Sequence, residues 1–295
     1  MGRLCDKYGY FPDCSEIDVK LGILASNIDH VMSADVLMEC FSLMDITTLH
    51  SEDTEESVSE LVDKVNSIKS SFPGYPMPAS ICVFPNFASI VSGRRNDVSV
   101  HVTTVSACFP SSQSYLEVKK LECRLAVENG ADEVDIVLAL NSFLAGDYEK
   151  ASSEIREIKS VITDAAAGRP ILLKVILETG LLPSPDIIAE ASFLAMEAGA
   201  DFIKTSTGKV SVNATPMSAY VMCECIKAYY ERTGVKVGFK AAGGISNAMD
   251  AVCYYSIVSS VLGSGWLDKR YFRFGVSRLA NALMSAIEQK TVNLF

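Results

Sequence analysis

Four ionisable residues stand in segments that otherwise have the apolar composition of buried strands. Asp135 lies in EVDIV, Lys174 in ILLKVIL and Lys240 in VGFKAAGG, and Lys204 ends the apolar part of DFIKTSTGK. Because side chains alternate across a strand, each one points into the protein or onto a helix layer, where an unpaired charge is costly. A lysine that reaches solvent from a strand end explains one such position. Four ionisable residues on successive strand segments indicate a functional site.

Lys204 and Lys240 fall at corresponding ends of two consecutive strand segments. A lysine attacks a carbonyl only as the neutral amine, and its ordinary pKa of about 10.4 leaves it protonated at neutral pH. A second cation within about 5 Å, together with removal from water, lowers that pKa. Asp135 is available to pair with either ammonium or to move protons. The pattern predicts carbonyl chemistry by a lysine amine, although spacing alone does not choose between the two lysines.

Three glycine-bearing loops follow the last three strand segments: Thr207-Gly208-Lys209, Gly243-Gly244 and Gly275-Val276-Ser277. Glycine lets backbone N–H groups approach phosphate oxygens closely, and in α/β barrels the last loops often hold a phosphate. Lys209 and Arg278 are available as cations beside them. For one loop, a tight turn would be the better explanation. Three consecutive loops favour a phosphate pocket.

The elements that carry these residues alternate along the chain from Leu43 onward. Short β-branched or apolar runs predict strands at Leu43–Thr47, Ile81–Phe84, Val98–Val105, Glu133–Leu138, Ile171–Leu177, Phe202–Thr205, Val237–Ala241 and Phe272–Gly275. Amphipathic stretches with capping signals predict helices at Glu52–Ser70, Tyr115–Asn129, Asp147–Thr163, Ser184–Glu197, Met217–Thr233, Ala248–Leu262 and Ser277–Gln289. The stretch Ser89–Asn96 is the weakest of the helical predictions.

Eight such units of about 30 to 40 residues predict a (β/α)₈ TIM barrel of the α/β class. The alternative, a doubly wound sheet, would carry a Gly-rich dinucleotide loop after its first strand, and the sequence has none there. Residues 1–42 begin irregularly and then have a helical pattern from about Ser15 to Cys40. We therefore predict an N-terminal extension, 1–42, packed on a barrel domain, 43–295.

Composition limits the classes of partner. The 295 residues carry a net charge of −10, which argues against a broad electrostatic grip on nucleic acid or on an anionic membrane. A hydrophobic fraction of 49% supplies a core, and no apolar run approaches the length of a membrane helix. Nine cysteines without an export signal indicate reduced thiols and a cytoplasmic location. We interpret His30, His50 and His101 as turn or surface residues and expect neither a metal nor a cofactor.

Seven segments together resemble one enzyme family. They are LMDITTL, ICVFPNF, NGADEVDIV, LLKVILETG, AGADFIKTSTGKVSVNATP, VGFKAAGGI and FRFGVS, which span most of the chain from Leu43. In order and content they resemble the deoxyribose-phosphate aldolases, and the GADFIKTSTGK segment is highly specific. The resemblance implies a class I aldolase with a TIM barrel fold. Such an enzyme cleaves 2-deoxy-D-ribose 5-phosphate to D-glyceraldehyde 3-phosphate and acetaldehyde through a lysine Schiff base, without metal.

The resemblance also implies roles for single residues. The lysine of FIKTSTG forms the Schiff base, which assigns Lys204, and Lys240 is the neighbour that lowers its pKa. Asp135 acts with an ordered water as proton shuttle. The remaining positions are those that line the substrate pocket (Asp45, Cys82), hold the phosphate (Gly208, Lys209, Gly243, Gly244, Ser277) and belong to the buried charge network around the substrate (Lys174).

Three positions depart from the family pattern. Ala241 replaces the proline that usually follows the second lysine, and Ser246 stands where some members have a phosphate-facing arginine. Arg278, one residue after Ser277, offers that positive charge from another loop. Many relatives end in a tyrosine that assists proton transfer, whereas this chain ends in Phe295, which has no hydroxyl.

Two functions of different classes follow from these residues. The leading one is a lyase that cleaves a phosphorylated deoxysugar, because Asp135, Lys204 and Lys240 are all present. The alternative is an aldolase-like protein with weak or lost turnover that binds a protein partner through the barrel or residues 1–42. A homodimer remains an open alternative for the assembly. A thiol enzyme acting through Cys82 is disfavoured, because no histidine lies near it in sequence.

Overall fold

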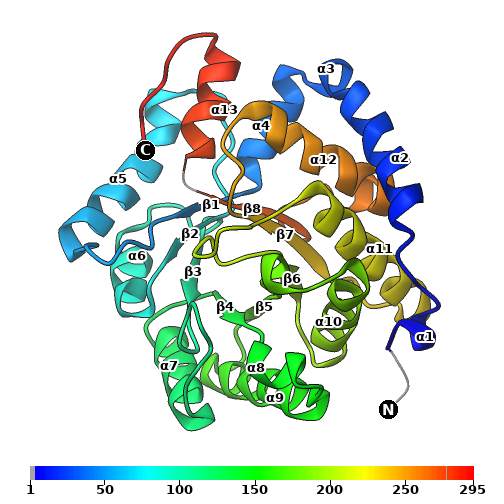
Figure 1. Ribbon diagram of the computed structural model, residues 1–295. Coiled ribbons are helices and arrows are strands. Elements are labelled where there is room, and N and C mark those ends of the chain that lie inside the picture. The colour runs from blue at the N-terminus through cyan, green and yellow to red at the C-terminus, as the bar shows by residue number, and fades with distance from the viewer. Residues whose placement is uncertain (1–3, 277) are drawn as a thin grey trace.

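The computed structural model describes residues 4–276 and 278–295 and contains a closed barrel of eight parallel strands in chain order (Figure 1). The strands are β1 (Met44–Thr47), β2 (Ser80–Val83), β3 (His101–Val105), β4 (Glu133–Val137), β5 (Leu172–Ile176), β6 (Phe202–Lys204), β7 (Gly238–Ala242) and β8 (Phe272–Gly275). Hydrogen bonding between β8 and β1 closes the barrel. The predicted TIM barrel is confirmed. The third strand is shorter than predicted, because Asp97 to Val100 form a turn that precedes it.

Helices follow the strands and cover the outside of the barrel (Figure 1). They are α5 (Glu55–Ser71), α6 (Ala88–Arg94), α7 (Leu116–Glu128), α8 (Leu140–Leu144), α9 (Tyr148–Ala165), α10 (Pro185–Glu197), α11 (Pro216–Thr233), α12 (Ala248–Leu262) and α13 (Leu279–Glu288). Short 3₁₀ turns lie at Pro85–Phe87, Thr179–Leu181 and Ser264–Trp266. Side-chain caps fix several starts, as at α11, where Thr215 and Ser218 form a reciprocal capping box.

The N-terminal segment contains four helices, α1 (Leu4–Tyr8), α2 (Cys14–Ser26), α3 (Ile28–Val31) and α4 (Ala34–Ser42). The prediction of an irregular start was wrong, because Leu4 and Cys5 donate their backbone N–H groups to the Glu190 carboxylate of α10 and so anchor a first helix. The predicted continuous helix is also interrupted. The chain turns at Asn27, and Ser33 caps a new helix.

These helices lie along the outer side of α10, α11, α12 and α13 (Figure 1). The ring of Tyr8 stacks on Phe193 of α10, with centroids 4.5 Å apart, and Glu39 of α4 accepts a hydrogen bond from Tyr255 of α12. Residues 4–42 therefore cover helices of the barrel rather than its open end. Their buried side chains belong to the same hydrophobic core as the barrel.

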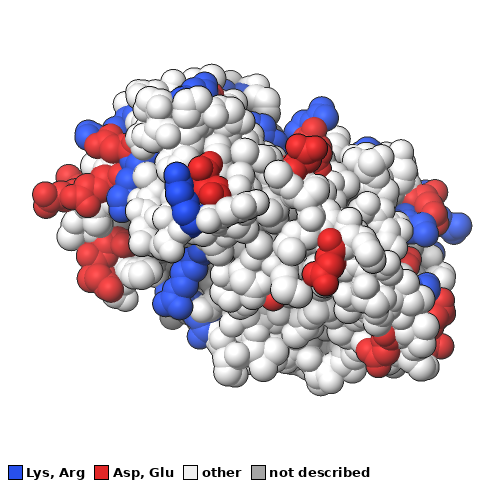
Figure 2. Space-filling view, turned by 90° about the horizontal axis from the view of Figure 1, so that it is seen from above, with Lys and Arg blue, Asp and Glu red and all other residues white. Residues whose placement is uncertain are grey.

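The surface seen from the top of Figure 1 has acidic and basic side chains in small separate groups, with uncharged residues between them (Figure 2). Along the described part of the chain, no helix combines the length and the apolar character needed to cross a membrane. None of the nine cysteines, all of which lie in the described part of the chain, forms a disulfide bond.

Candidate active site

Strand register brings the ionisable residues of the sequence analysis into the barrel interior. Asp135 of β4 is paired with Lys174 of β5, and Lys204 of β6 with Lys240 of β7. The next pairing joins Lys240 to Arg273 of β8. Because alternate residues of a parallel strand face the same side, these side chains all point inward. Inward-facing residues of a barrel normally form an apolar core, whereas here they form a charged one.

The charged core contains seven side chains from six strands. They are Asp45, Glu133, Asp135, Lys174, Lys204, Lys240 and Arg273, of which Lys204 is the most exposed at 4%. Four cations minus three carboxylates leaves one positive charge in excess if every group is ionised. Unbalanced charge inside a protein is unfavourable. Release of one proton from a lysine of this cluster would make the core neutral.

Asp135 is the centre of the cluster. One carboxylate oxygen lies 2.8 Å from Lys204 Nζ and 2.8 Å from Lys240 Nζ, and the other lies 3.0 Å from Lys174 Nζ. Burial by itself would raise the pKa of Asp135, but the three neighbouring lysines hold that pKa well below its ordinary value. Asp135 is therefore a carboxylate that three amino groups share.

The three lysines differ in how many carboxylates they contact. Lys174 pairs with Glu133 and Asp135 and lies 3.9 Å from Asp45 Oδ2. Lys240 pairs with Asp135 and with Asp45, whose Oδ2 lies 2.5 Å from Lys240 Nζ. Lys204 pairs with Asp135. The described residues give Lys204 no second ion pair. It is thus the lysine whose charge the structure compensates least.

The pKa shifts have the directions that these contacts imply. Burial lowers the pKa of Lys204, the positive charge of Lys240 lowers it further, and Asp135 opposes both without reversing the shift. Burial would lower the pKa of Lys240 too, but Asp135 and Asp45 hold it above its ordinary value. Of the two lysines that the sequence spacing left undistinguished, Lys204 is therefore the one whose surroundings favour the neutral amine.

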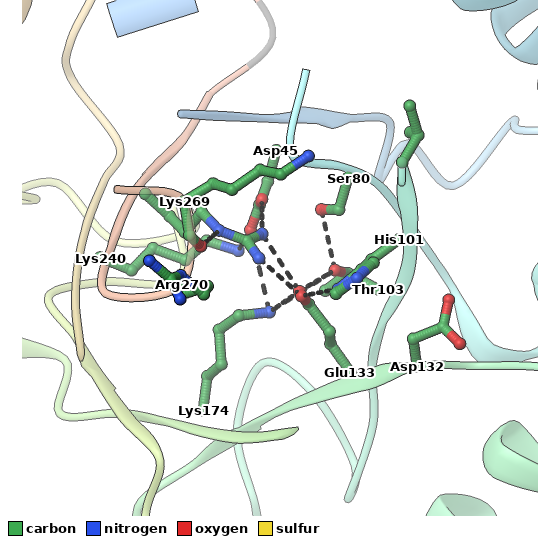
Figure 3. A network of polar contacts seen from close by, with 12 residues as sticks. Asp45, Ser80, His101, Thr103, Asp132, Glu133, Lys174, Lys240, Lys269 and Arg270 are labelled. Carbon is green, nitrogen blue, oxygen red and sulfur yellow. Dashed lines mark hydrogen bonds and ion pairs between the residues drawn. The ribbon is translucent and has the colours of Figure 1, made fainter. Parts of the chain in front are cut away.

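Sequence reasoning missed the group of residues on the other side of the cluster. Arg273 contacts Asp45 Oδ1 at 2.6 Å and Glu133 Oε1 at 2.7 Å. Glu133 also accepts a hydrogen bond from Thr103 at 2.7 Å and lies 2.7 Å from His101 Nδ1 (Figure 3). Two signals were in the sequence: Glu133 stands two residues before Asp135 in EVDIV, and Arg273 lies between phenylalanines in FRFG. His101 is a surface histidine only in part, because its ring contacts this buried carboxylate.

Asp45 and Cys82, which the resemblance assigns to the lining of the substrate pocket, lie beside the lysines in the barrel interior. Burial would raise the pKa of Asp45, but Lys240 and Arg273 hold it below its ordinary value, so Asp45 is a carboxylate. Cys82 is fully buried, and burial raises the pKa of its thiol. A protonated thiol is a poor nucleophile, which weakens the thiol-enzyme interpretation further.

Gly275 makes room for Lys240. A Cβ atom at Gly275 would lie 2.6 Å from Lys240 Cε, so a larger residue at the end of β8 would displace the lysine side chain. The strand that carries Lys240 runs unbroken through Ala241, which is paired with Phe274 of β8. Ion pairs and a neighbouring glycine thus position Lys240 in a strand where alanine replaces the usual proline.

A pocket of about 620 Å³ lies at the carboxyl ends of β1, β6, β7 and β8. Its walls include predicted phosphate residues, Gly208, Lys209, Gly243, Gly244 and Arg278, together with Ser246. Ser277, also predicted here, lies outside the described residues. Gly243 has a φ of +78°, and a Cβ there would lie 2.6 Å from Asn213 Oδ1, so both conformation and space require glycine. The predicted glycine loops are therefore together in one pocket wall.

Contacts from two residues, Glu178 and Leu49, fix the position of the loop that follows β6. Lys209 Nζ donates to the carbonyl oxygen of Leu49, 2.7 Å away in the loop after β1. Glu178, buried after β5, accepts hydrogen bonds from the backbone N–H of Thr207 at 3.1 Å and from its hydroxyl at 2.5 Å. Glu178 was not singled out in the sequence, although it lies in the LETG segment. These contacts fix where the N–H groups of residues 207–209 lie.

The sequence profile of the DeoC/LacD family aldolases matches residues 40–255, which is more than half of the chain. The protein belongs to this aldolase family. It is therefore a carbon–carbon lyase, and the family suspected from the sequence segments is confirmed at this level. Among the described residues of the aldolase, no group of three or more His, Cys, Asp or Glu side chains is arranged to hold a metal ion.

Solved structures of similar proteins agree with this assignment. The aldolase is 26% identical to QR15, an aldolase, with a TM-score of 0.68, over 85% of this chain and 96% of that one. It is 25% identical to a tetrameric deoxyribose phosphate aldolase from Aeropyrum pernix, with a TM-score of 0.68, over 93% and 98%. A putative deoxyribose-phosphate aldolase from Toxoplasma gondii ME49 shares the fold at 21% identity, with a TM-score of 0.74, over 87% and 95%.

Proposed function

We propose that this aldolase is a class I enzyme that cleaves 2-deoxy-D-ribose 5-phosphate reversibly to D-glyceraldehyde 3-phosphate and acetaldehyde. The observation that carries the proposal is the position of Lys204. It is a buried lysine with one carboxylate partner and a lowered pKa, in register with a second lysine and on the strand that leads into the glycine-lined pocket. Such an amine is suited to attack a sugar aldehyde.

The first half of the reaction forms the imine. The neutral Lys204 amine attacks C1 of the open-chain sugar, and the carbinolamine loses water to give a protonated imine. A neutral amine still donates one N–H to Asp135 while its lone pair attacks. Lys240 stays an ammonium throughout, because Asp135 and Asp45 hold its pKa above the ordinary value. Its positive charge therefore favours the neutral form of Lys204, while its own ammonium group does not attack the substrate.

The second half breaks the bond between C2 and C3. Removal of the proton from the C3 hydroxyl releases D-glyceraldehyde 3-phosphate, and the electron pair of the bond moves into the imine to form an enamine on Lys204. Protonation of the enamine at C2, followed by addition of water to the imine, releases acetaldehyde and restores the amine. We assign the proton transfers to Asp135 acting with a water molecule, supported by its contacts with both Lys204 and Lys240.

The substrate phosphate is proposed to bind in the pocket at the ends of β6, β7 and β8. Backbone N–H groups of the loops that contain Gly208, Gly243 and Gly244 would bind its oxygens, as glycine-rich turns do in other barrels. Lys209 and the exposed Arg278 supply the positive charge. Arg278 immediately precedes α13, so its charge adds to the favourable potential at the start of that helix.

Borohydride trapping tests the proposal. Reduction in the presence of acetaldehyde should add a stable ethyl group to the peptide that contains Lys204, and 2-deoxy-D-ribose 5-phosphate should compete with this labelling. The Lys204→Arg variant, whose guanidinium forms no imine, is the control and should remain unlabelled. Labelling of Lys240 instead of Lys204, or no labelling at either position, would contradict the mechanism.

A further inference from the structure

Arg273 is the one guanidinium within the charged core, and the proposed chemistry gives it no role. It is 1% exposed, although a side chain of this size and charge is seldom fully buried. It lies on β8, next to the strand that carries Lys240. Its guanidinium lies over the Phe202 ring and donates a hydrogen bond to the carbonyl oxygen of Lys269. Burial of a charge at this cost calls for an explanation.

Arg273 takes up two of the three carboxylates of the core. Its guanidinium contacts Asp45 Oδ1 at 2.6 Å, Glu133 Oε1 at 2.7 Å and Glu133 Oε2 at 3.3 Å. Glu133 is shared further with Lys174 and His101, and Asp45 with Lys240. Asp135 alone then remains as the ion-pair partner of Lys204 among the described residues.

We propose that Arg273 is a positioning residue that keeps the Lys204 amine neutral, because its charge makes four cations against three carboxylates in the core. With Arg273 in place, the cluster is neutral only when one lysine has lost its proton, and Lys204 has the fewest compensating contacts. Without Arg273, three lysines would face three carboxylates, and a charged Lys204 would be balanced. The proposal deepens the proposed function, on which its consequence for turnover rests.

The groups that act on Lys204 come from several strands. Asp135 of β4 contacts it, Lys240 of β7 and the Cys82 thiol of β2 lie close to it, and its register partner on β5 is the apolar Ile176. Asp45 of β1 and Glu133 of β4 contact Arg273, Lys240 of β7 is its register partner, and His101 of β3 contacts Glu133. A test must therefore separate the charge of Arg273 from the packing around it.

The test measures the ionisation of Lys204 without substrate. The rate at which acetic anhydride labels the Lys204 peptide is followed against pH by mass spectrometry, because the reagent attacks the neutral amine alone. In the Arg273→Gln variant, loss of a cation favours the ammonium form, and the labelling midpoint should move up by about one pH unit. The Arg273→Lys variant keeps the charge and should stay close to the parent protein.

A double variant separates charge from packing. Glu133→Gln removes one negative charge, so the midpoint should move down. Combining Glu133→Gln with Arg273→Gln leaves three lysines against two carboxylates, again one cation in excess, and the midpoint should return to that of the parent. If Arg273 acts only through packing, the midpoint of the double variant should be displaced further than that of either single variant, because the double variant loses more contacts. The series is repeated in a His101→Gln background, so that the imidazole in contact with Glu133 contributes nothing to the differences between variants.

The outcomes are distinct from those of the trapping experiment. An unchanged midpoint in Arg273→Gln, or a double variant displaced further than the single ones, would overturn the proposal. If Arg273→Gln does not fold, the downward shift in Glu133→Gln and its reversal in the double variant carry the same test, and the absence of that shift contradicts it. If acetaldehyde forms no imine with the parent protein, the proposed function fails, while the labelling midpoints still decide the role of Arg273.

Discussion

The charged core of the barrel and the pocket at its opening are built in opposite ways. In the core, seven charged side chains from six strands hold one another in place, and the most exposed of them is only 4% accessible. The pocket, by contrast, is lined by residues of loops at the strand ends, among them four glycines and the cations Lys209 and Arg278. The proposed amine chemistry depends on the balance of the buried charges, whereas the proposed phosphate binding depends on hydrogen-bond donors and space. Changes in the core should therefore have larger effects than changes in the pocket.

The largest effect is expected for Lys204. The Lys204→Met variant removes the only group to which we assign covalent chemistry, so the rate of sugar phosphate cleavage should fall by at least about 10⁴-fold. Steady-state cleavage and borohydride trapping are measured on the same preparation. Lys240→Met serves as the comparison, because it should keep the nucleophile but leave its amine more protonated than in the parent. Residual cleavage in Lys204→Met comparable to that in Lys240→Met would remove the distinction between the two lysines.

Asp135→Asn should weaken folding as well as catalysis. The change leaves Lys174 and Lys240 each with one carboxylate partner fewer inside the barrel, and loss of one partner of a buried ion pair costs about 3 to 5 kcal/mol. The free energy of unfolding in urea at pH 7 measures this effect. Asp97→Asn, in a surface ion pair with Lys69, is a control that should cost at most about 1 kcal/mol. Equal losses in the two variants would show that the core pairs contribute no more than surface pairs.

Lowering the pH should weaken the same buried ion pairs. The pKa values of Asp45, Glu133 and Asp135 are all lower in the folded protein than the ordinary values expected of an unfolded chain. Their contribution to stability is therefore fully present above about pH 5 and is lost progressively as the pH falls below about 4, toward the folded pKa values. Unfolding free energies from pH 7 to pH 3 should show this decline. If the unfolding free energy of Asp135→Asn depends less steeply on pH than that of the parent, part of the decline comes from the charged core.

Arg278→Ala should affect the pocket alone. A charge-assisted contact with phosphate contributes about 1.5 to 3 kcal/mol, so binding of the phosphorylated sugar should weaken by that amount. The reaction with free deoxyribose should be nearly unchanged. Arg270→Ala is a matched control, because Arg270 is an exposed arginine before β8 that pairs with Asp268. An equal loss on both substrates in Arg278→Ala would indicate a structural role.

The smallest effect is expected at the C-terminus. The backbone of Phe295 is held by Asn281 of α13, which donates to the Phe295 carbonyl at 2.7 Å and accepts from its N–H at 3.1 Å. A hydroxyl added by Phe295→Tyr would be carried by a tail bound to this helix. Exchange of acetaldehyde methyl protons with deuterated solvent should change by less than tenfold, well below the roughly 10²- to 10⁴-fold that a positioned acid–base group contributes.

A larger increase in Phe295→Tyr would mean that the tail leaves Asn281 and supplies a proton in the active site. Asn281→Ala, which frees the tail, then becomes the informative background for the same measurement. Normal imine trapping without exchange or cleavage in either protein would instead favour the binding-protein alternative.

The sequence by itself determined the barrel and marked the candidate catalytic residues, by rules that act over short distances. Alternation of apolar strands and capped helices predicted eight units, and Asp135, Lys204 and Lys240 were visible because each interrupts an apolar strand. The first N-terminal helix was missed, because it depends on Glu190, 185 or more residues away.

Only the tertiary structure gave the two lysines different surroundings and showed which charges act on each of them. The contacts of Arg273 with Asp45 and Glu133 join residues 228 and 140 positions apart, and no local pattern specifies such pairs. A pKa depends on the sum of burial and of every nearby charge. That sum exists only once the barrel has closed, because closure of β8 onto β1 brings the last strand's arginine to the first strand's aspartate.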